Sequence, residues 1–477
     1  MVLTLIAAYA WTLREQLPKT VTITRTASGF VPTKVYLQRG DTVRFVSDID
    51  LPFWPASDSH PNHTRYPAFD PKTEVPPRGE WSFTFMEPGV WPLHDHMASQ
   101  FHGTIFVAGD DGETIESCLR TNTDTIRAVC WEADLKKIID DTGLTAAFDQ
   151  FRLWYTEDPE FQRNCHDVTH ILGVEAFHEF KDHDTVVTLP ETGYCGFGFY
   201  HGFVEEMARE YGVGRLEEGA RYCDSLIEPG RFENKHAADE ARAGCYHGMG
   251  HAIFDSLDGT LWGDAPKMVA KSITECERLT TEEHKRERCG SGIFNALSIA
   301  YGSDLYKLSF SDNNPTAVCS TLSPPYRSVC YTEIATGYVR NRNLLSFEEG
   351  LVYMTTLPRI EDQSAGVYGI IDDEVRRKIA HLDIKGIHAT CEKLPRKELL
   401  TICMEGILTG FNNGITPEKK FDRMVEFCSL YTPGSLGRKS CFGGIRGRLL
   451  SQFSYEEIDA LCTSLPSATD TTACRAK

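Results

Sequence analysis

Residues 245–253 read CYHGMGHAI, a cysteine followed by two glycines and by two histidines that lie four residues apart. Segments of this kind, which open with a cysteine and continue with small and apolar residues, occur seven times in the chain. A helical repeat of roughly 40 residues is typical of an α-solenoid, in which each unit packs against its neighbours. The seven segments are CHDVTHILG at 165–173, CGFGFYHGF at 195–203, CYHGMGHAI at 245–253, CGSGIFNAL at 289–297, CYTEIATGY at 330–338, CMEGILTGF at 403–411 and CFGGIRGRL at 441–449.

Glycine lies three residues after the cysteine in five of the seven segments. Because glycine costs about 1 kcal/mol relative to alanine inside a helix, its recurrence at one position needs a packing reason. We therefore expect neighbouring helices to approach each other closely at that level. The long gap between Cys330 and Cys403 has room for a further copy without cysteine, near Gly366 and Gly369.

The 16 cysteines are all found at or after Cys118. Six pairs are separated by 10 to 12 residues, Cys223/Cys245 is a wider pair, and Cys165 and Cys195 pair by elimination. This pattern predicts disulfides that join the end of one helix to the start of the next, in an oxidising compartment. The alternative is a cytosolic protein with reduced or metal-binding thiols, but zinc sites usually have more closely spaced cysteines. The six regular pairs are Cys118/Cys130, Cys276/Cys289, Cys319/Cys330, Cys391/Cys403, Cys428/Cys441 and Cys462/Cys474.

The chain has 477 residues and a formal net charge of −19, and this length suggests two to four domains. An acidic chain repels the phosphates of nucleic acids, so general nucleic-acid binding is not expected. The body of the sequence has no apolar run of about 18 residues, the length that a membrane-spanning helix needs. Residues 1–18 contain a short apolar run and Ala8-Tyr9-Ala10. They are interpreted as a signal peptide or the remnant of a membrane anchor, or else as an apolar first strand or helix.

Residues 19–109 contain no cysteine and alternate between apolar and polar residues as strands do, for example at Val43 and Phe45. Several short strands separated by turns predict an all-β sandwich. The polar stretch GDDGE at 109–113 is the expected linker. The predicted domains are therefore the N-terminal segment 1–18, the β-sandwich 19–109 and an all-α, disulfide-stapled helical repeat 110–477.

Four segments of the β region occur in a characteristic order: GFVP at 29–32, GDTVRF at 40–45, GVWPLHDH at 89–96 and GTIFV at 103–107. In these segments, residues 19–109 resemble a cupredoxin, the family of plastocyanin and azurin. The resemblance implies a Greek-key β-sandwich with a metal site at one end. The sequence departs from the family at two ligand positions, because Phe53 instead of histidine follows Pro52, and the region lacks cysteine. The thiolate of a type 1 copper centre is therefore absent.

Histidines gather instead in His60-Pro61-Asn62-His63 and His94-Asp95-His96. His94 and His96 are two residues apart and so share one face of a strand. Ligation by imidazoles alone suits Cu(II), zinc or nickel, and the cupredoxin resemblance favours copper. The alternative is a set of surface histidines on a sandwich that has lost its metal. The expected ligands are His60, His63, His94 and His96, with His102 as a further candidate.

Five more histidines lie within six residues of the first three repeat cysteines. His166 and His170, like His247 and His251, are spaced i, i+4 and share a helix face. His201 and His251 each lie six residues after their cysteine, so stacked repeats place them together. The expected second metal site, or proton-transfer cluster, consists of His170, His201, His247 and His251, with Glu175, Glu205 and Glu206 as candidate completing groups. The alternative is that these imidazoles cap carbonyl groups of a neighbouring turn.

Three functions from different classes fit these features. The first is an extracytoplasmic copper-binding protein in copper handling or redox chemistry, whose helical repeat binds a protein partner or a second metal and whose N-terminus is a candidate membrane tether. The second is a metal-free binding module at the cell surface. The third is a metallo-enzyme centred on the helical histidines. Metal analysis of protein purified without added metal separates the first two, while the sequence leaves open whether the protein is an enzyme.

The disulfide framework makes the first testable prediction. Thiol titration of the denatured, unreduced protein should detect close to zero free cysteines, because every cysteine has an expected partner. If most of the 16 cysteines reacted as thiols, the oxidising compartment would be the wrong expectation.

Overall fold

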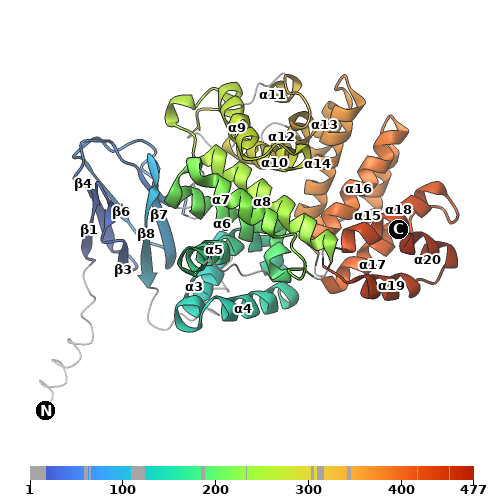
Figure 1. Cartoon of the computed structure of the whole chain (residues 1–477), viewed down its shortest axis with the longest axis horizontal. Helices are drawn as coiled ribbons and strands as arrows, with labels where there is room; N and C mark the ends of the chain where they lie inside the picture. The colour runs from blue at the N-terminus through green and yellow to red at the C-terminus, as the bar shows by residue number, and fades with distance from the viewer. Residues whose placement is uncertain are drawn as a thin grey trace, which may run out of the picture. The chain divides into compact units, whose positions relative to one another are not determined.

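The computed structural model describes residues 18–57, 63, 66–108, 124–183, 189–232, 234–301, 306–308, 316–340, 345–415, 417–450 and 452–476. The chain divides into two compact units, Met1–Ala133 and Asp134–Lys477, which are a β unit and a helical unit (Figure 1). The expected linker at 109–113 and residues 1–17 of the N-terminal segment lie outside the described residues.

The β unit is a sandwich of two four-stranded sheets. The first sheet has the order β2 (Gly29–Val31), β1 (Thr20–Thr26), β4 (Thr42–Ser47) and β6 (Glu80–Thr84). The second has the order β3 (Lys34–Gln38), β8 (Ala98–Ala108), β7 (Gly89–Asp95) and β5 (Pro55–Ser57). Strands β1 and β4 pair in parallel, as do β3 and β8, while β7 and β8 are antiparallel. The predicted Greek-key sandwich is confirmed.

The core of the sandwich follows from the two-residue period of its strands, because alternate side chains point to one face. Val43 and Phe45 of β4 are fully buried between the sheets. Phe45 stacks on Phe69 and Trp81 at ring-centroid distances of 5.6 and 5.8 Å. The sandwich therefore closes around an aromatic cluster. Polar side chains lie at one end of the second sheet, where β7 and β5 meet.

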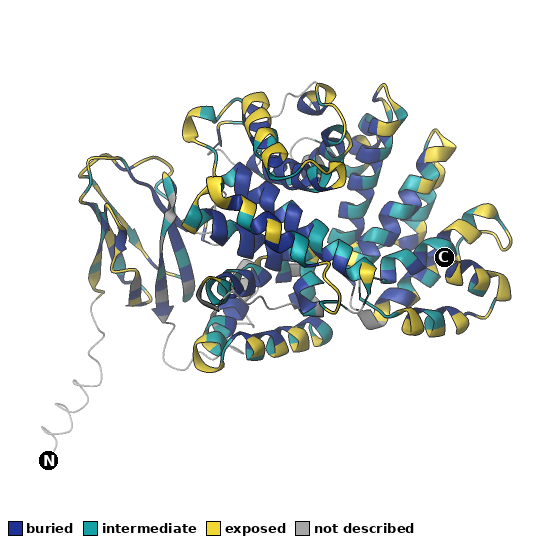
Figure 2. Ribbon diagram, viewed as in Figure 1, coloured by how far each residue is buried: buried dark blue, intermediate teal, exposed yellow. Residues whose placement is uncertain are grey.

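The helical unit contains a row of helices that we call the core helices, because they hold the cysteine-glycine segments and most of the buried residues. Each core helix packs against the next one in the row, and Figure 2 shows buried residues gathered along it. The core helices are α5 (Pro159–His183), α6 (Tyr194–Tyr211), α8 (Lys235–Asp255), α10 (Glu283–Ala300), α12 (Tyr326–Arg340), α14 (Ile360–Lys378), α16 (Lys397–Gly414), α18 (Leu436–Leu449) and α20 (Ala468–Arg475).

A second set, the flanking helices, alternates with the core helices along the chain and packs against them. These are α7 (Leu216–Ser225), α9 (Ala265–Leu279), α11 (Ala317–Ser320), α13 (Phe347–Thr355), α15 (Ile384–Glu392), α17 (Pro417–Cys428) and α19 (Tyr455–Thr463). Helices α3 (Asp124–Thr142) and α4 (Leu144–Glu157) precede the row, and short 3-10 turns lie at η1 (Pro190–Gly193), η2 (Val213–Arg215), η3 (Gly259–Leu261) and η5 (Ile379–His381). The predicted all-α repeat after the sandwich is confirmed.

Disulfides join the last turns of six flanking helices to the core helix that follows, as the cysteine spacing predicted. They are Cys223–Cys245, Cys276–Cys289, Cys319–Cys330, Cys391–Cys403, Cys428–Cys441 and Cys462–Cys474. Cys165–Cys195, predicted by elimination, joins α5 to α6. Cys130 is also disulfide-bonded, and its predicted partner Cys118 lies outside the described residues. A bridge over a loop this short stabilises the fold by about 3 kcal/mol in the chain-entropy model.

The expected copy without cysteine is helix α14, which packs between α12 and α16 in the row. Gly366 takes the place of the core-helix cysteine, and a Cβ at this position would overlap the side chain of Met354 on α13. The thioether of Met354 is fully buried. In this repeat, the flanking and core helices are therefore held together by a methionine packed on a glycine instead of a disulfide.

Glycines allow the core helices to approach each other backbone to backbone, as the sequence predicted. Three residues after the cysteine, a Cβ on Gly198 of α6 would overlap the carbonyl oxygen of His166 on α5, and one on Gly292 of α10 would overlap that of His247 on α8. Gly202 of α6 lies at a different position and meets the carbonyl oxygen of His170 in the same way. Gly250 of α8 faces the carbonyl oxygen of Cys289 on α10 in the same way.

Along the described part of the chain, no helix is both long enough and apolar enough to cross a membrane.

The close approach can be tested with a matched pair of glycine substitutions. Gly292→Ala should lower the free energy of unfolding by about 1–3 kcal/mol, the usual cost of overpacking, although alanine is the better helix former. Gly447→Ala on α18 is the control, since no described atom lies within 4 Å of its Cβ position; it should be neutral or stabilising by up to about 1 kcal/mol. Urea unfolding measures both variants, and equal effects would contradict the close approach.

Candidate metal centres

The first cluster of histidines lies where β7 ends. His94 and Asp95 are the last residues of β7, and His96 follows in the turn, so the two histidines share a face while Asp95 points the other way. The Asp95 carboxylate accepts hydrogen bonds from Arg25 Nε at 2.6 Å and from the backbone N–H groups of Trp54 and Met97 at 2.9 and 3.1 Å. This buried anchor fixes the backbone from which both imidazoles project.

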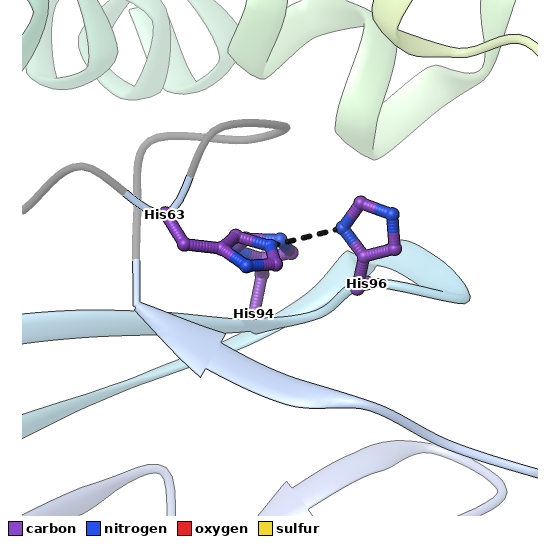
Figure 3. A group of neighbouring side chains, drawn as sticks. All are labelled: His63, His94 and His96. Carbon is purple, nitrogen blue, oxygen red and sulfur yellow. Dashed lines mark hydrogen bonds between the residues drawn. The ribbon is translucent and has the colours of Figure 1, made fainter. Parts of the chain in front are cut away.

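His63 joins His94 and His96 from the loop after β5 (Figure 3). One ligand nitrogen from each ring lies within 4.8 Å of the others, and His63 Nε2 is 3.0 Å from His96 Nδ1. The exposed fractions of His63, His94 and His96 are 2%, 1% and 3%. His63 also has a left-handed backbone with φ of 51°, a conformation that is uncommon for a residue other than glycine. Three buried imidazoles therefore converge on one point.

Asp70 orients the ring of His63. Its carboxylate lies 2.6 Å from His63 Nδ1 and accepts hydrogen bonds from Trp54 Nε1 and the backbone N–H of Lys72 at 2.8 and 2.7 Å. Burial would raise the pKa of Asp70, but its hydrogen bonds with His63 and Lys72 lower that pKa overall. Burial lowers the pKa of His63 despite the nearby carboxylate. The ring is therefore neutral at pH 7, and its Nε2 is directed at the other imidazoles, as in metal sites with a carboxylate behind the ligand.

Two histidines of the β unit were also expected at this site. His60 lies outside the described residues. His102 is paired with His94 in the backbone register of β7 and β8, and its side chain is not among those described. The structure thus brings together three of the four expected ligands, and it adds Asp70, which no spacing in the sequence indicated.

The second cluster is built from three consecutive core helices. His166 and His170 come from α5, His201 from α6, and His247 and His251 from α8. The ring centroid of His201 lies 5.0 and 5.5 Å from those of His166 and His170, and 5.0 and 4.8 Å from those of His247 and His251. Within each of two triads, the ligand nitrogens lie within 4.8 Å of one another, and His201 belongs to both triads.

Burial and mutual repulsion favour the neutral form of four of these rings. Burial lowers the pKa of His201 and His247 well below the ordinary value and that of His251 to about 4. It also lowers the pKa of His166. Neutral imidazole is the form that binds metal ions. Of the five rings, His166 alone has a described hydrogen bond with a carbonyl group, that of Cys195 at 2.7 Å, so carbonyl capping does not account for the cluster.

One of the three candidate glutamates faces this cluster. Glu205 Oε2 lies 3.4 Å from His170 Nδ1, and Glu205 also groups with His251 and Asp255. Burial would raise the pKa of Glu205, but His170 and His251 lower it overall, so the carboxylate is charged. Glu206 instead pairs with Arg209 at 2.6 Å. Asp255, four residues after His251, was missed by the sequence interpretation although the i, i+4 spacing was available.

The remaining candidates lie elsewhere. Glu175 is half-buried and has His178 and Asp140 as neighbours. His178 groups with Glu206 and Glu210, but Glu206 is bound to Arg209 and Glu210 to Lys181. These two cations make the third group a network of ion pairs.

Comparisons with known proteins concern the β unit. No protein-family model matches the chain, and no curated protein matches it. Solved structures that match include a Cu(I) form of a mutant amicyanin, with 14% identity and a TM-score of 0.16, covering 19% of this chain and 82% of that chain. A purple cupredoxin from Nitrosopumilus maritimus matches with 15% identity and a TM-score of 0.16, covering 18% of this chain and 99% of that chain. Likenesses of this size carry no functional argument, so the chemistry depends on the residues of the site.

Asp70 provides a test of the first centre. Asp70→Asn should weaken binding of Cu(II), used as the probe, by about 10–100-fold, because the group that orients a ligand histidine is lost. Competition titration against a chelator measures the affinity, in a His201→Gln background that disables the helical cluster. Asp50→Asn is the control, since Asp50 is 85% exposed in the same unit. Equal affinities of the two variants would show that Asp70 does not support a ligand.

Proposed function

We propose that this protein is an extracytoplasmic copper-binding protein whose β-sandwich holds one copper ion through His63, His94 and His96. The observation that carries the proposal is the convergence of three buried imidazoles, with ligand nitrogens within 4.8 Å, at one end of a cupredoxin-like sandwich. Rings with exposed fractions of 1–3% do not act as surface groups.

Copper is favoured by the donor set. Imidazole nitrogens suit Cu(II), Ni(II) and Zn(II), and Cu(II) binds most tightly of the three to a given set of nitrogen ligands. The described part of the β unit contains no thiolate ligand, so the centre differs from a blue-copper site. Three ligands, the number found among the described residues, would leave a coordination position for a further group such as solvent, substrate or a transfer partner. Such a position is compatible with copper handling and with redox chemistry.

The chain's own residues prepare this site in three steps. Arg25 neutralises Asp95, and Asp95 holds the backbone of Trp54 and Met97, so that the turn carrying His96 is fixed. Asp70 directs His63 toward the same point. The bound copper would supply a redox couple or a Lewis acid, and the protein would limit solvent access through the burial of its ligands.

An extracytoplasmic location is supported by the disulfides, which persist in oxidising compartments. The seven bridges between described cysteines join consecutive helices of the helical unit. Residues 1–18 are proposed to direct export or to tether the protein. The helical row is proposed to bind a protein partner, since solenoids present extended surfaces for recognition.

Two other functions remain as alternatives with their own tests. A metal-free binding module at the cell surface would have no use for the carboxylate of Asp70 behind His63, and it would be purified without metal. A metallo-enzyme centred on the helical histidines would depend on His201 and not on His94. Metal analysis of the purified protein distinguishes the first alternative from copper binding.

The β-sandwich site can be tested in the full chain by removing two ligands together. In a His201→Gln background, the protein should bind about one Cu(II) per chain without the intense thiolate-to-copper absorption of blue-copper proteins, because no cysteine ligand is available. Adding His94→Ala and His96→Ala should abolish binding. His284→Gln is the control, since His284 is 57% exposed. Stoichiometric copper in this triple variant, with His94→Ala and His96→Ala added to His201→Gln, would overturn the assignment.

A further inference from the structure

We propose that the helical unit holds a pair of transition-metal ions bridged by the ring of His201. One ion would be bound by His166, His170 and His201, and the other by His201, His247 and His251. The proposal requires no metal in the β-sandwich and so stands apart from the function proposed above.

His201 is the shared member of both triads. Its exposed fraction is 3%, and neither Nδ1 nor Nε2 has a hydrogen-bond partner among the described residues. A buried imidazole normally satisfies at least one of its nitrogens, because an unpaired polar group in the interior costs free energy. A ring with two buried, unpaired nitrogens, between two pairs of histidines, has the geometry of a bridging ligand.

The other four rings are each held on one nitrogen, which leaves the second for a metal ion. His166 Nδ1 is 2.7 Å from the carbonyl oxygen of Cys195, and His247 Nδ1 is 2.9 Å from Ser291 Oγ. His170 Nδ1 faces Glu205 at 3.4 Å. The Nε2 atoms of His170 and His251 are buried without a partner in the described chain. This is the arrangement of metal ligands oriented by neighbouring groups.

The partners of His166 and His251 are themselves held in place by the fold. Cys195 and Phe197 have left-handed backbones with φ of 55° and 64°, and this turn at the start of α6 directs the carbonyl group of Cys195 at His166. His251 has a hydrogen bond with the side chain of Asn295, which lies on the next core helix, α10. Strained backbone of the kind at Cys195 persists where the surrounding structure holds it, and it is concentrated at functional sites.

Charge and distance are compatible with two ions. The carboxylate of Glu205 lies beside both halves of the cluster, 3.4 Å from His170 Nδ1 and grouped with His251. Nitrogens around one tetrahedral ion lie roughly 3.3 Å apart when each bond is about 2.0 Å, so small ring rotations would close each triad from its present spacing. A ring that ligates through both nitrogens is an imidazolate, and its N–H proton is released to solvent when the second ion binds.

Imidazole ligands select the class of metal. Nitrogen donors suit Cu(II), Zn(II) and Ni(II), whereas oxygen-rich sites suit magnesium and calcium. We therefore use Cu(II) as the probe, because two Cu(II) ions joined by an imidazolate are magnetically coupled and lose electron paramagnetic resonance (EPR) intensity relative to their copper content.

The experiment uses the full chain with His94→Ala and His96→Ala, so that failure of the β-sandwich site does not affect the result. After loading with Cu(II) and removal of excess metal, this protein should contain about two copper ions per chain. Its integrated EPR intensity should account for well under half of that copper. Zinc-loaded protein should likewise contain about two ions per chain.

The decisive variant is His201→Gln in this background, which should lower the copper content to close to zero, because neither triad then has three imidazoles. His166→Gln and His247→Gln should each remove one ion and abolish the coupling. The matched controls are His284→Gln, which is 57% exposed, and His236→Gln, which is 37% exposed; neither should change copper content or coupling. Far-UV circular dichroism and urea unfolding of each variant establish that the helical unit is folded.

Three outcomes would overturn the proposal. A single, magnetically isolated ion that is lost in His247→Gln but kept in His166→Gln would show a mononuclear site. Two uncoupled copper ions that persist in folded His201→Gln would show that His201 is not a bridge. Absence of stoichiometric copper and zinc from the folded protein would show that the cluster is not a metal site.

Discussion

The helical unit depends on the backbone-to-backbone contact of consecutive core helices. Gly202 and Gly292 permit this contact, because any side chain there would overlap a carbonyl oxygen of the preceding core helix. When helices approach so closely, side chains at equivalent positions of successive repeats come into contact. This is why His201, on a helix separate from the other histidines, lies 4.8–5.5 Å from four other imidazole rings. Six disulfides hold the flanking helices, whereas Cys165–Cys195 joins two core helices, α5 and α6.

The two clusters bring imidazole rings together in different ways. In the sandwich, a strand supplies two rings by its two-residue period, and a loop with strained backbone supplies His63. In the helical unit, α5 and α8 each supply two rings through the four-residue spacing. Helix α6, which packs against both of them, supplies the fifth ring. Both clusters contain rings held on one nitrogen, by Asp70 in one case and by Ser291 or the Cys195 carbonyl group in the other. Orientation by a neighbour, more than the number of histidines, distinguishes them from chance groups of polar residues.

Features that arise from regular spacing were predictable from the sequence. The cysteine spacing indicated the disulfide partners, the glycine position indicated the close approach, and the i, i+4 histidines indicated the helical cluster. Contacts between residues far apart in irregular segments were not predictable, because no period relates them. Asp70 reaches His63 through a loop, and Arg25 reaches Asp95 across 70 residues and between the two sheets. The left-handed turn at Cys195 was also unforeseen, since non-glycine residues rarely adopt that conformation.

The core helices continue to pack in the same way beyond α8, but other residues replace the histidines. Ser291 and Asn295 of α10 take the histidine positions and donate hydrogen bonds to Glu333 of α12 at 2.7 and 2.8 Å. Burial raises the pKa of Glu333, while Arg288 and Arg376 lie close enough to oppose that rise. At this level the buried carboxylate of Glu333 thus has two hydrogen-bond donors and two nearby arginines as its partners. Among the described residues of the row, the convergence of histidines is therefore confined to the first three core helices, although the close glycine contacts run further along it.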